Sequence, residues 1–198
     1  MGNVIKFTYF IIALMFLMGC TSSNKEDEEF DNSVFWGEWY LNENAKITVL
    51  TFDALRFNGV EYPNPSIQEL DRFYGNWAYF ADSQSLVLNE TRESGGATIE
   101  IYYQLIQVDK YSMKLREKSL KKTVLFLKIV EKINLHVGEY QDISYMMNHS
   151  IIAHNYSSSD NSTVTVDSSG KVTAISPGIA FITISTDVGT LIVQVKVS

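Results

Sequence analysis

The sequence predicts an all-β protein that consists of two successive β domains behind a short N-terminal segment. Residues 99–105 and 111–116 alternate apolar with polar side chains, which is the pattern of half-buried strands. Aromatic residues make up 13% of the 198 residues, and this composition favours strands over helices. Turn signals such as Asn58-Gly59 separate the apolar runs, because both residues tolerate the positive φ of a tight hairpin turn.

Residues 1–19 have the three parts of a secretory signal peptide. Lys6 supplies a positive start, residues 7–18 are apolar, and the small Gly19 precedes Cys20, the only cysteine in the chain. The apolar run is shorter than the about 20 residues that a helix needs to cross a bilayer. We therefore expect a cleaved signal and not a membrane-spanning helix.

The end of this segment, Leu17-Met18-Gly19-Cys20, resembles the bacterial lipobox. The resemblance implies that Cys20 is acylated, becomes the first residue of the mature protein and anchors it in the outer membrane. Acyl chains contribute about 0.8 kcal/mol per buried CH₂, so several chains give an effectively permanent anchor. The alternative is an ordinary signal peptide with a coincidental cysteine.

Residues 20–32 are polar and acidic, so we expect them to be a solvated tether. Lys25-Glu26-Asp27 resembles the Lys-(Asp/Glu)₂ export signal that some Gram-negative surface lipoproteins carry just after the acylated cysteine. That resemblance implies display on the cell surface. The alternative is a plain spacer.

Residues 33–130 are predicted to form seven or eight strands joined mostly by hairpins. A capping box at Ser66 and Glu69 predicts a short helix that ends near Tyr74. Successive hairpins favour an up-and-down antiparallel sheet, and such a sheet hides its edges by closing into a barrel. Further turn signals are Asp82-Ser83-Gln84, Ser94-Gly95-Gly96 and Asp109-Lys110.

Two Gly-x-Trp elements, Gly37-Glu38-Trp39 and Gly75-Asn76-Trp77, are each expected to open a strand. The second is followed by an acidic turn and then by Leu86-Val87-Leu88. The order of these elements resembles the lipocalin-like domains of bacterial surface lipoproteins. The resemblance implies a small up-and-down barrel.

The three tryptophans, Trp36, Trp39 and Trp77, all lie in this segment. They are candidates for an aromatic-lined site for a lipid, a glycan or a peptide. For Trp39 and Trp77 we favour the interpretation that they fill the barrel, since about eight strands leave an interior just wide enough for side chains; Trp36 is less constrained.

Residues 131–198 contain no tryptophan and are rich in Ser, Thr and Val. The run Val164-Thr165-Val166-Asp167-Ser168-Ser169-Gly170-Lys171-Val172, the turn at Pro177-Gly178 and the strand-like Ala180-Phe181-Ile182-Thr183-Ile184 resemble the bacterial Ig-like group 2 family. The resemblance implies a small β-sandwich, which is usually a spacer or an adhesion module.

The sequence contains no constellation for catalysis. No nucleophile elbow, triad-like motif or Gly-rich phosphate loop occurs, and one cysteine excludes a multi-Cys zinc site. His136, His149 and His154 lack a metal-ligand spacing. The net charge of −7 argues against a nucleic-acid partner. We therefore expect neither an enzyme nor a metal or organic cofactor.

Together these features predict a membrane-anchored cell-surface lipoprotein. Its expected role is that of a non-catalytic binding or adhesion module for a glycan, a protein or a small apolar ligand. The alternative is a structural or assembly accessory of an envelope or surface complex, with no ligand of its own.

Overall fold

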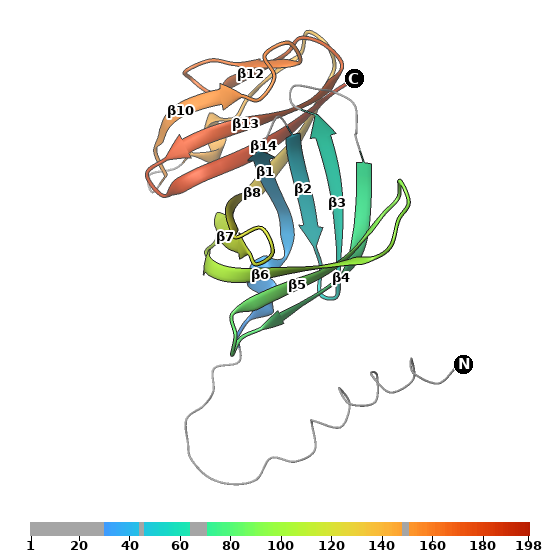
Figure 1. Ribbon diagram of the computed structural model, residues 1–198. Helices are drawn as coiled ribbons and strands as arrows, with labels where there is room; N and C mark the ends of the chain where they lie inside the picture. The colour runs from blue at the N-terminus through green and yellow to red at the C-terminus, as the bar shows by residue number, and fades with distance from the viewer. Residues whose placement is uncertain (1–29, 44–45, 64–70, 148–150) are drawn as a thin grey trace, which may run out of the picture. The chain divides into compact units, whose positions relative to one another are not determined.

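The computed structural model describes residues 30–43, 46–63, 71–147 and 151–198 (Figure 1). Residues 31–198 form one compact unit. Among the described residues, no helix has the length and apolar character needed to cross a membrane. Several predicted features lie outside the described residues: the signal peptide, Cys20, most of the tether, the start of the predicted helix and His149.

Eight antiparallel strands close into a barrel (Figure 1). Each strand pairs with the next, and pairing of Trp39 and Tyr40 in β1 with Lys128 and Leu127 in β8 closes the ring. A short 3₁₀ helix, η1 (Asn32–Phe35), precedes the first strand. The strands are β1 (Gly37–Glu43), β2 (Lys46–Phe52), β3 (Arg56–Pro63), β4 (Asp71–Phe80), β5 (Ser85–Arg92), β6 (Ile99–Val108), β7 (Ser112–Glu117) and β8 (Lys122–Leu135). The predicted all-β class and the closed antiparallel barrel are confirmed.

The barrel interior is divided into an apolar part and a charged part. Because neighbouring residues of a strand point to opposite faces, the register places Trp39, Leu50 and Gly59 on the inner face. The apolar part is a buried cluster of Phe35, Trp39, Leu50, Phe52, Phe57, Phe73, Leu86, Leu88, Leu105, Met113, Leu115, Val124 and Phe126. The same register brings charged residues to the inner face beside the β1–β2, β3–β4, β5–β6 and β7–β8 connections, among them Glu43, Lys46, Glu61, Asp71, Glu90, Arg92, Glu117 and Lys122.

Two local predictions in this region are wrong. Residues 71–74 belong to β4 and not to the predicted helix, because Phe73 pairs with Gly59 on one side and with Arg92 on the other. Two ladders and a buried ring outweigh a local helix-capping pattern. Asn58-Gly59 lies inside β3 and not in a turn, and the aromatic ring of Phe73 fills the space beside Gly59.

The other turn signals lie between strands as expected. The segments around Asp82, Gly95 and Asp109 connect β4 to β5, β5 to β6 and β6 to β7. The first Gly-x-Trp element opens β1 at Gly37, as expected. The second lies in the middle of β4, so it does not open a strand.

Gly75 is required by the close approach of β4 and β5. A Cβ atom at this position would lie 1.7 Å from the backbone oxygen of Asn89, so a larger residue must displace one of the two backbones. We expect Gly75→Ala to lower the free energy of unfolding by about 1–3 kcal/mol, the usual cost of overpacking. Urea unfolding measures this change. The exposed neighbour Asn76 provides the control, because Asn76→Ala should stay within about 0.5 kcal/mol. Equal stabilities of the two variants would contradict this prediction.

The remaining strands extend and cover the large sheet. They are β9 (Tyr140–Asp142), β10 (Ala153–Ser158), β11 (Val164–Val166), β12 (Lys171–Ala174), β13 (Gly178–Thr186) and β14 (Gly189–Val197), with a 3₁₀ helix, η2 (Ser144–Met146), after β9. Strand β14 pairs in parallel with the second half of β8, and β13 and β10 follow, which gives an eleven-stranded sheet. Strands β11, β12 and β9 form a second sheet. A buried cluster with residues from both sheets, such as Val172 and Val193, lies between them.

Strand β8 belongs to both regions of the fold. The expected domain boundary between residues 130 and 131 lies within this strand. A third buried cluster joins the outer face of β1–β3 to β13 and β14: the ring centroid of Phe181 lies 4.9 Å from that of Tyr40 and 6.2 Å from that of Tyr62. This part of the outer barrel face is therefore covered by the chain itself.

Candidate functional site

The three tryptophans have different environments. Trp39 is fully buried in the barrel core, and its indole Nε1 donates a hydrogen bond of 2.7 Å to the backbone oxygen of Phe35. Trp77 is half-buried, and it packs edge-on against Phe35 and Phe52 with ring centroids 5.6 Å away in each case. Trp36 is 47% exposed. The structure therefore brings Trp39 and Trp77 together around Phe35 in the interior and leaves Trp36 at the surface.

The side chain of Lys128 contacts two tryptophans, Trp36 just before β1 and Trp39 within β1. Its Nζ lies 4.2 Å from the ring centroid of Trp39 and donates to the backbone oxygen of Trp36. Burial lowers the pKa of Lys128, while the ring and the carbonyl oxygen provide partners for the charged form. The hydrogen bond from Lys128 therefore holds the residue that follows η1 next to β8.

The predicted histidines provide no metal centre in the described region. His136 and His154 are exposed, and the imidazole Nδ1 of His136 lies 3.3 Å from Oε2 of Glu139. No group of three or more His, Cys, Asp and Glu side chains suited to a metal occurs within the described ranges.

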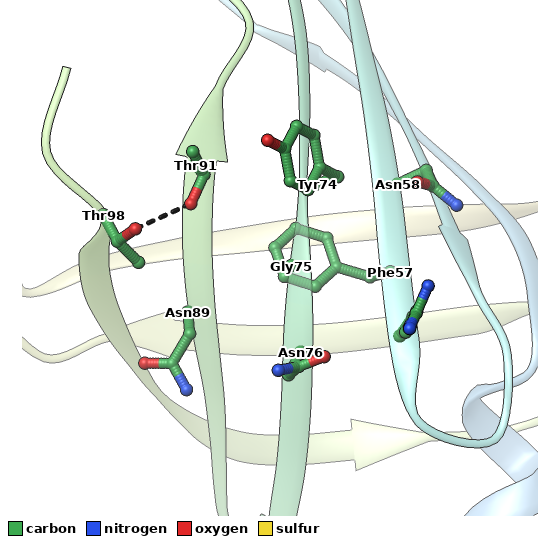
Figure 2. Close-up of a pocket in the computed structure, with 9 residues that line it drawn as sticks. Phe57, Asn58, Tyr74, Gly75, Asn76, Asn89, Thr91 and Thr98 are labelled. Atoms are coloured by element: carbon green, nitrogen blue, oxygen red, sulfur yellow. Dashed lines mark hydrogen bonds between the residues drawn. The ribbon is translucent and has the colours of Figure 1, made fainter. Parts of the chain in front are cut away.

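A polar groove of about 460 Å³ lies on the outer face of the barrel over β3, β4 and β5 (Figure 2). Its side chains form two rows that cross the strands. The pairings Asn58–Tyr74 and Tyr74–Thr91 give the first row. The pairings Arg56–Asn76 and Asn76–Asn89 give the second. Residues of one row lie two positions along each strand from those of the other, a spacing of about 7 Å. We call this set, with Gly75 between the rows, the groove.

The floor of the groove is backbone, because the residues between the two outward-facing rows point into the barrel. The hydroxyl groups of Thr91 and Thr98 are 2.7 Å apart and form a hydrogen bond, which ties the start of β6 to the rim of the groove (Figure 2). The ring of Tyr74 is 49% exposed. The groove is therefore built on paired strands whose backbones are held in place.

The side-chain amides of the groove have no hydrogen-bond partner among the residues that the structure describes. Within the described part of the chain, the side chains of Asn58, Asn76 and Asn89 make no hydrogen bond to other residues. Each amide offers one acceptor oxygen and two N–H donors. Arg56 is the single cationic side chain among the lining residues, and none of them is acidic. The lining of the groove thus offers hydrogen-bond donors and acceptors with little charge.

A cluster of charged side chains lies on the inner face behind the groove. Arg92 Nη1 is 3.1 Å from Glu61 Oε2 and 3.1 Å from Asp71 Oδ2, and its Nε is 2.9 Å from Glu90 Oε1. Burial favours a raised pKa of Glu61, but hydrogen bonds from Arg92 and Lys46 outweigh it and lower the pKa. Burial raises the pKa of Glu90, whose Oε1 forms no aligned hydrogen bond despite the short ionic contact. This cluster links β3, β4 and β5 through ion pairs on the inner face.

Reasoning from the sequence missed the groove. Its residues come from three strands, and none belongs to a motif. In the sequence, Asn58 belongs to a turn signal, and Asn76 is the middle residue of a Gly-x-Trp element. The available signal was an uncharged asparagine in each of two neighbouring strands, Asn76 in β4 and Asn89 in β5.

Comparisons of the chain with protein-family models, with curated proteins and with solved structures found no match.

Proposed function

We propose that the protein is a cell-surface lipoprotein, anchored through acyl chains on Cys20, and that its barrel is a non-catalytic binding module. The observation that carries the binding part is the groove: it presents three side-chain amides, which lack a hydrogen-bond partner among the described residues, beside the half-exposed Tyr74. Unpaired polar groups that converge on a concave surface are typical of ligand sites.

The proposal also assigns a domain type and a role to each of the two regions of the fold. The barrel corresponds to a lipocalin-like domain that binds on its outer face, since Trp39 and other aromatic side chains pack inside it. The region of β9–β14 corresponds to an Ig-like sandwich that serves as a rigid support. Two facing sheets with a shared apolar core support this assignment, and fold alone does not give a function.

The anchor is tested by replacing its cysteine. We expect Cys20→Ser to abolish incorporation of a labelled fatty acid and to release the protein from the outer membrane, because the lost acyl chains supply the membrane affinity. Ser22→Ala, two residues away, should change neither result. Unchanged acyl labelling of the Cys20 variant would exclude the anchor. Protease treatment of intact cells tests surface display, and survival of the protein would place it on the inner leaflet.

A second candidate function, an assembly accessory, is favoured by strand β10. This strand ends the large sheet among the described residues, and its sequence Ala-His-Asn-Tyr-Ser-Ser contains no Lys, Asp, Glu or Pro that would discourage pairing with another strand. Stable co-purification with envelope proteins after chemical cross-linking of cells supports this candidate. A monomer that cross-links to nothing contradicts it.

A further inference from the structure

We infer that the ligand of the groove is a neutral oligosaccharide. This inference rests on the proposed function, namely that the groove is the binding site, and it names the chemical class of the ligand. Four features of the groove carry it: the amides, the tyrosine ring, the charge of the lining and the size.

The amides match the chemistry of sugar hydroxyl groups. A hydroxyl both donates and accepts hydrogen bonds, and so does each side-chain amide of Asn58, Asn76 and Asn89. Asn76 and Asn89 are direct cross-strand partners, so their amides lie side by side on the second row (Figure 2). Their positions on paired strands limit the conformational freedom that binding must remove.

The ring of Tyr74 offers an apolar face beside these polar groups. One face of a pyranose ring presents C–H groups, which pack against an aromatic ring, while its edges carry hydroxyls. Tyr74 stands in the first row, about 7 Å from the amides of the second row along the strand direction. The residue between the rows, Gly75, lies at an inward-facing position of β4, so no side chain stands between the rows and a flat ring can lie over the backbone with its edge toward the amides.

The charge of the lining argues against an anionic ligand. Arg56 is the one cation among the described residues that line the groove, and the chain carries a net charge of −7. Binding a polyanion depends on several cations acting together, and a strongly negative protein repels polyanions at a distance. A purely apolar ligand would leave the three amides buried without partners, which costs free energy.

The size of the groove argues against a folded protein as the ligand. A stable protein–protein interface covers about 800 Å² on each partner. A volume of about 460 Å³ falls instead in the range of roughly 300–1,000 Å³ that is typical of small-molecule sites. A short oligosaccharide segment fits a site of this volume and needs no contact area as large as that of a folded protein.

The test uses the full lipidated chain in detergent micelles and measures binding to immobilised polysaccharides. The neutral probes are a β-glucan, a mannan, a xylan and a galactan; the anionic probes are polygalacturonan and heparin; mucin serves as a glycoprotein probe. The groove variants are Tyr74→Ala and Asn76→Ala. Their matched controls are Tyr102→Ala, which removes an exposed tyrosine on β6, and Asn134→Ala, which removes an exposed asparagine on β8. Thermal unfolding verifies that all four variants fold.

We expect at least one neutral probe to bind, with an affinity that changes little between low and high salt. Tyr74→Ala should weaken binding about 10-fold and Asn76→Ala about 3- to 10-fold, as lost ring packing and lost hydrogen bonds imply. Both controls should bind like the wild type. Periodate, which cleaves vicinal diols, should destroy the binding capacity of the probe.

Other outcomes overturn the inference in distinguishable ways. Binding to mucin that survives periodate but not protease would replace the glycan by a protein ligand and leave the groove as the site. Binding to the anionic probes alone, lost in high salt and with Arg56→Gln, would exclude a neutral sugar. Failure of all neutral probes overturns the inference. Glycan binding that the groove variants leave unchanged overturns the proposed site as well.

Discussion

Trp39→Ala is expected to lower the free energy of unfolding by about 3–5 kcal/mol, the range for removing a buried aromatic side chain. Trp39 has no exposed surface, it belongs to the apolar cluster of the barrel, and it pairs with Lys128 at the closing strand. Its loss also leaves the backbone oxygen of Phe35 without the 2.7 Å hydrogen bond from the indole. Urea unfolding followed by far-UV circular dichroism measures the change.

The control for this prediction is Trp36→Ala. Trp36 is 47% exposed, and a surface substitution of this kind typically changes stability by less than about 0.5 kcal/mol. If the two variants unfold at the same urea concentration, Trp39 does not hold the barrel together and the interior is more open than the packing indicates.

Arg92→Met is expected to cost about 3 kcal/mol of stability at neutral pH. Arg92 contacts three carboxylates, and the side chains of two of them, Glu61 and Glu90, are 8% and 5% exposed. Removing the cation leaves buried negative charges without compensation, which typically costs about 3–5 kcal/mol. The lower end applies because the Arg92 side chain is 35% exposed and water screens the lost interaction. Methionine preserves the contact with the ring of Phe73, over which the guanidinium lies at 5.0 Å.

The loss should depend on pH in a defined direction. Because the folded state lowers the pKa of Glu61, its ionised form stabilises the fold above its unfolded pKa, and this contribution disappears as the pH falls through the folded value. The difference between wild type and Arg92→Met should therefore shrink from pH 7 towards acidic pH. Urea unfolding at pH 7 and at pH 4 measures it, and a difference that grows on acidification would contradict the ionic explanation.

Two further variants separate the charge of Arg92 from its packing. Lys46→Met removes the other cation of Glu61, whose side chain is 40% exposed, and should cost less than Arg92→Met. Adding Glu90→Gln to Arg92→Met should restore part of the lost stability, since burial raises the pKa of Glu90 and its ionised form weakens the fold at neutral pH. A double variant less stable than Arg92→Met alone would show that Glu90 acts through packing.

The all-β class and the closed barrel could be predicted from the sequence, because period-two alternation and hairpin turns are local properties. Residues around Asp82, Gly95 and Asp109 connect strands as local turn chemistry requires. Where local preference and pairing disagree, pairing decides. Phe73 enters a strand despite the capping box before it, and Gly59 sits inside β3 because the ring of Phe73 covers it.

The groove could not be predicted, because its geometry depends on register. Asn58, Asn76 and Asn89 come together only when β3, β4 and β5 pair in one particular alignment, and a shift by one residue would turn the amides into the core. The shared strand β8 was also missed. Its sequence from Val124 to Leu135 is apolar on both sides of Glu131-Lys132, but nothing local indicates that one strand runs through or that β14 pairs with it in parallel. The Ig-like character of the C-terminal region and the lipid anchor stay predictions.

The double role of β8 has a consequence for the order in which the chain folds. Barrel closure requires segments near residues 40 and 128 to meet, and β14 then requires a β8 that is already formed, since it pairs alongside residues 129–135. Contacts between such distant segments slow folding, with all-β domains reaching milliseconds to seconds. Strand β14 can pair in its final register only once residues 129–135 are extended, so we expect substitutions that weaken this half of β8 to slow the addition of β14 in refolding experiments.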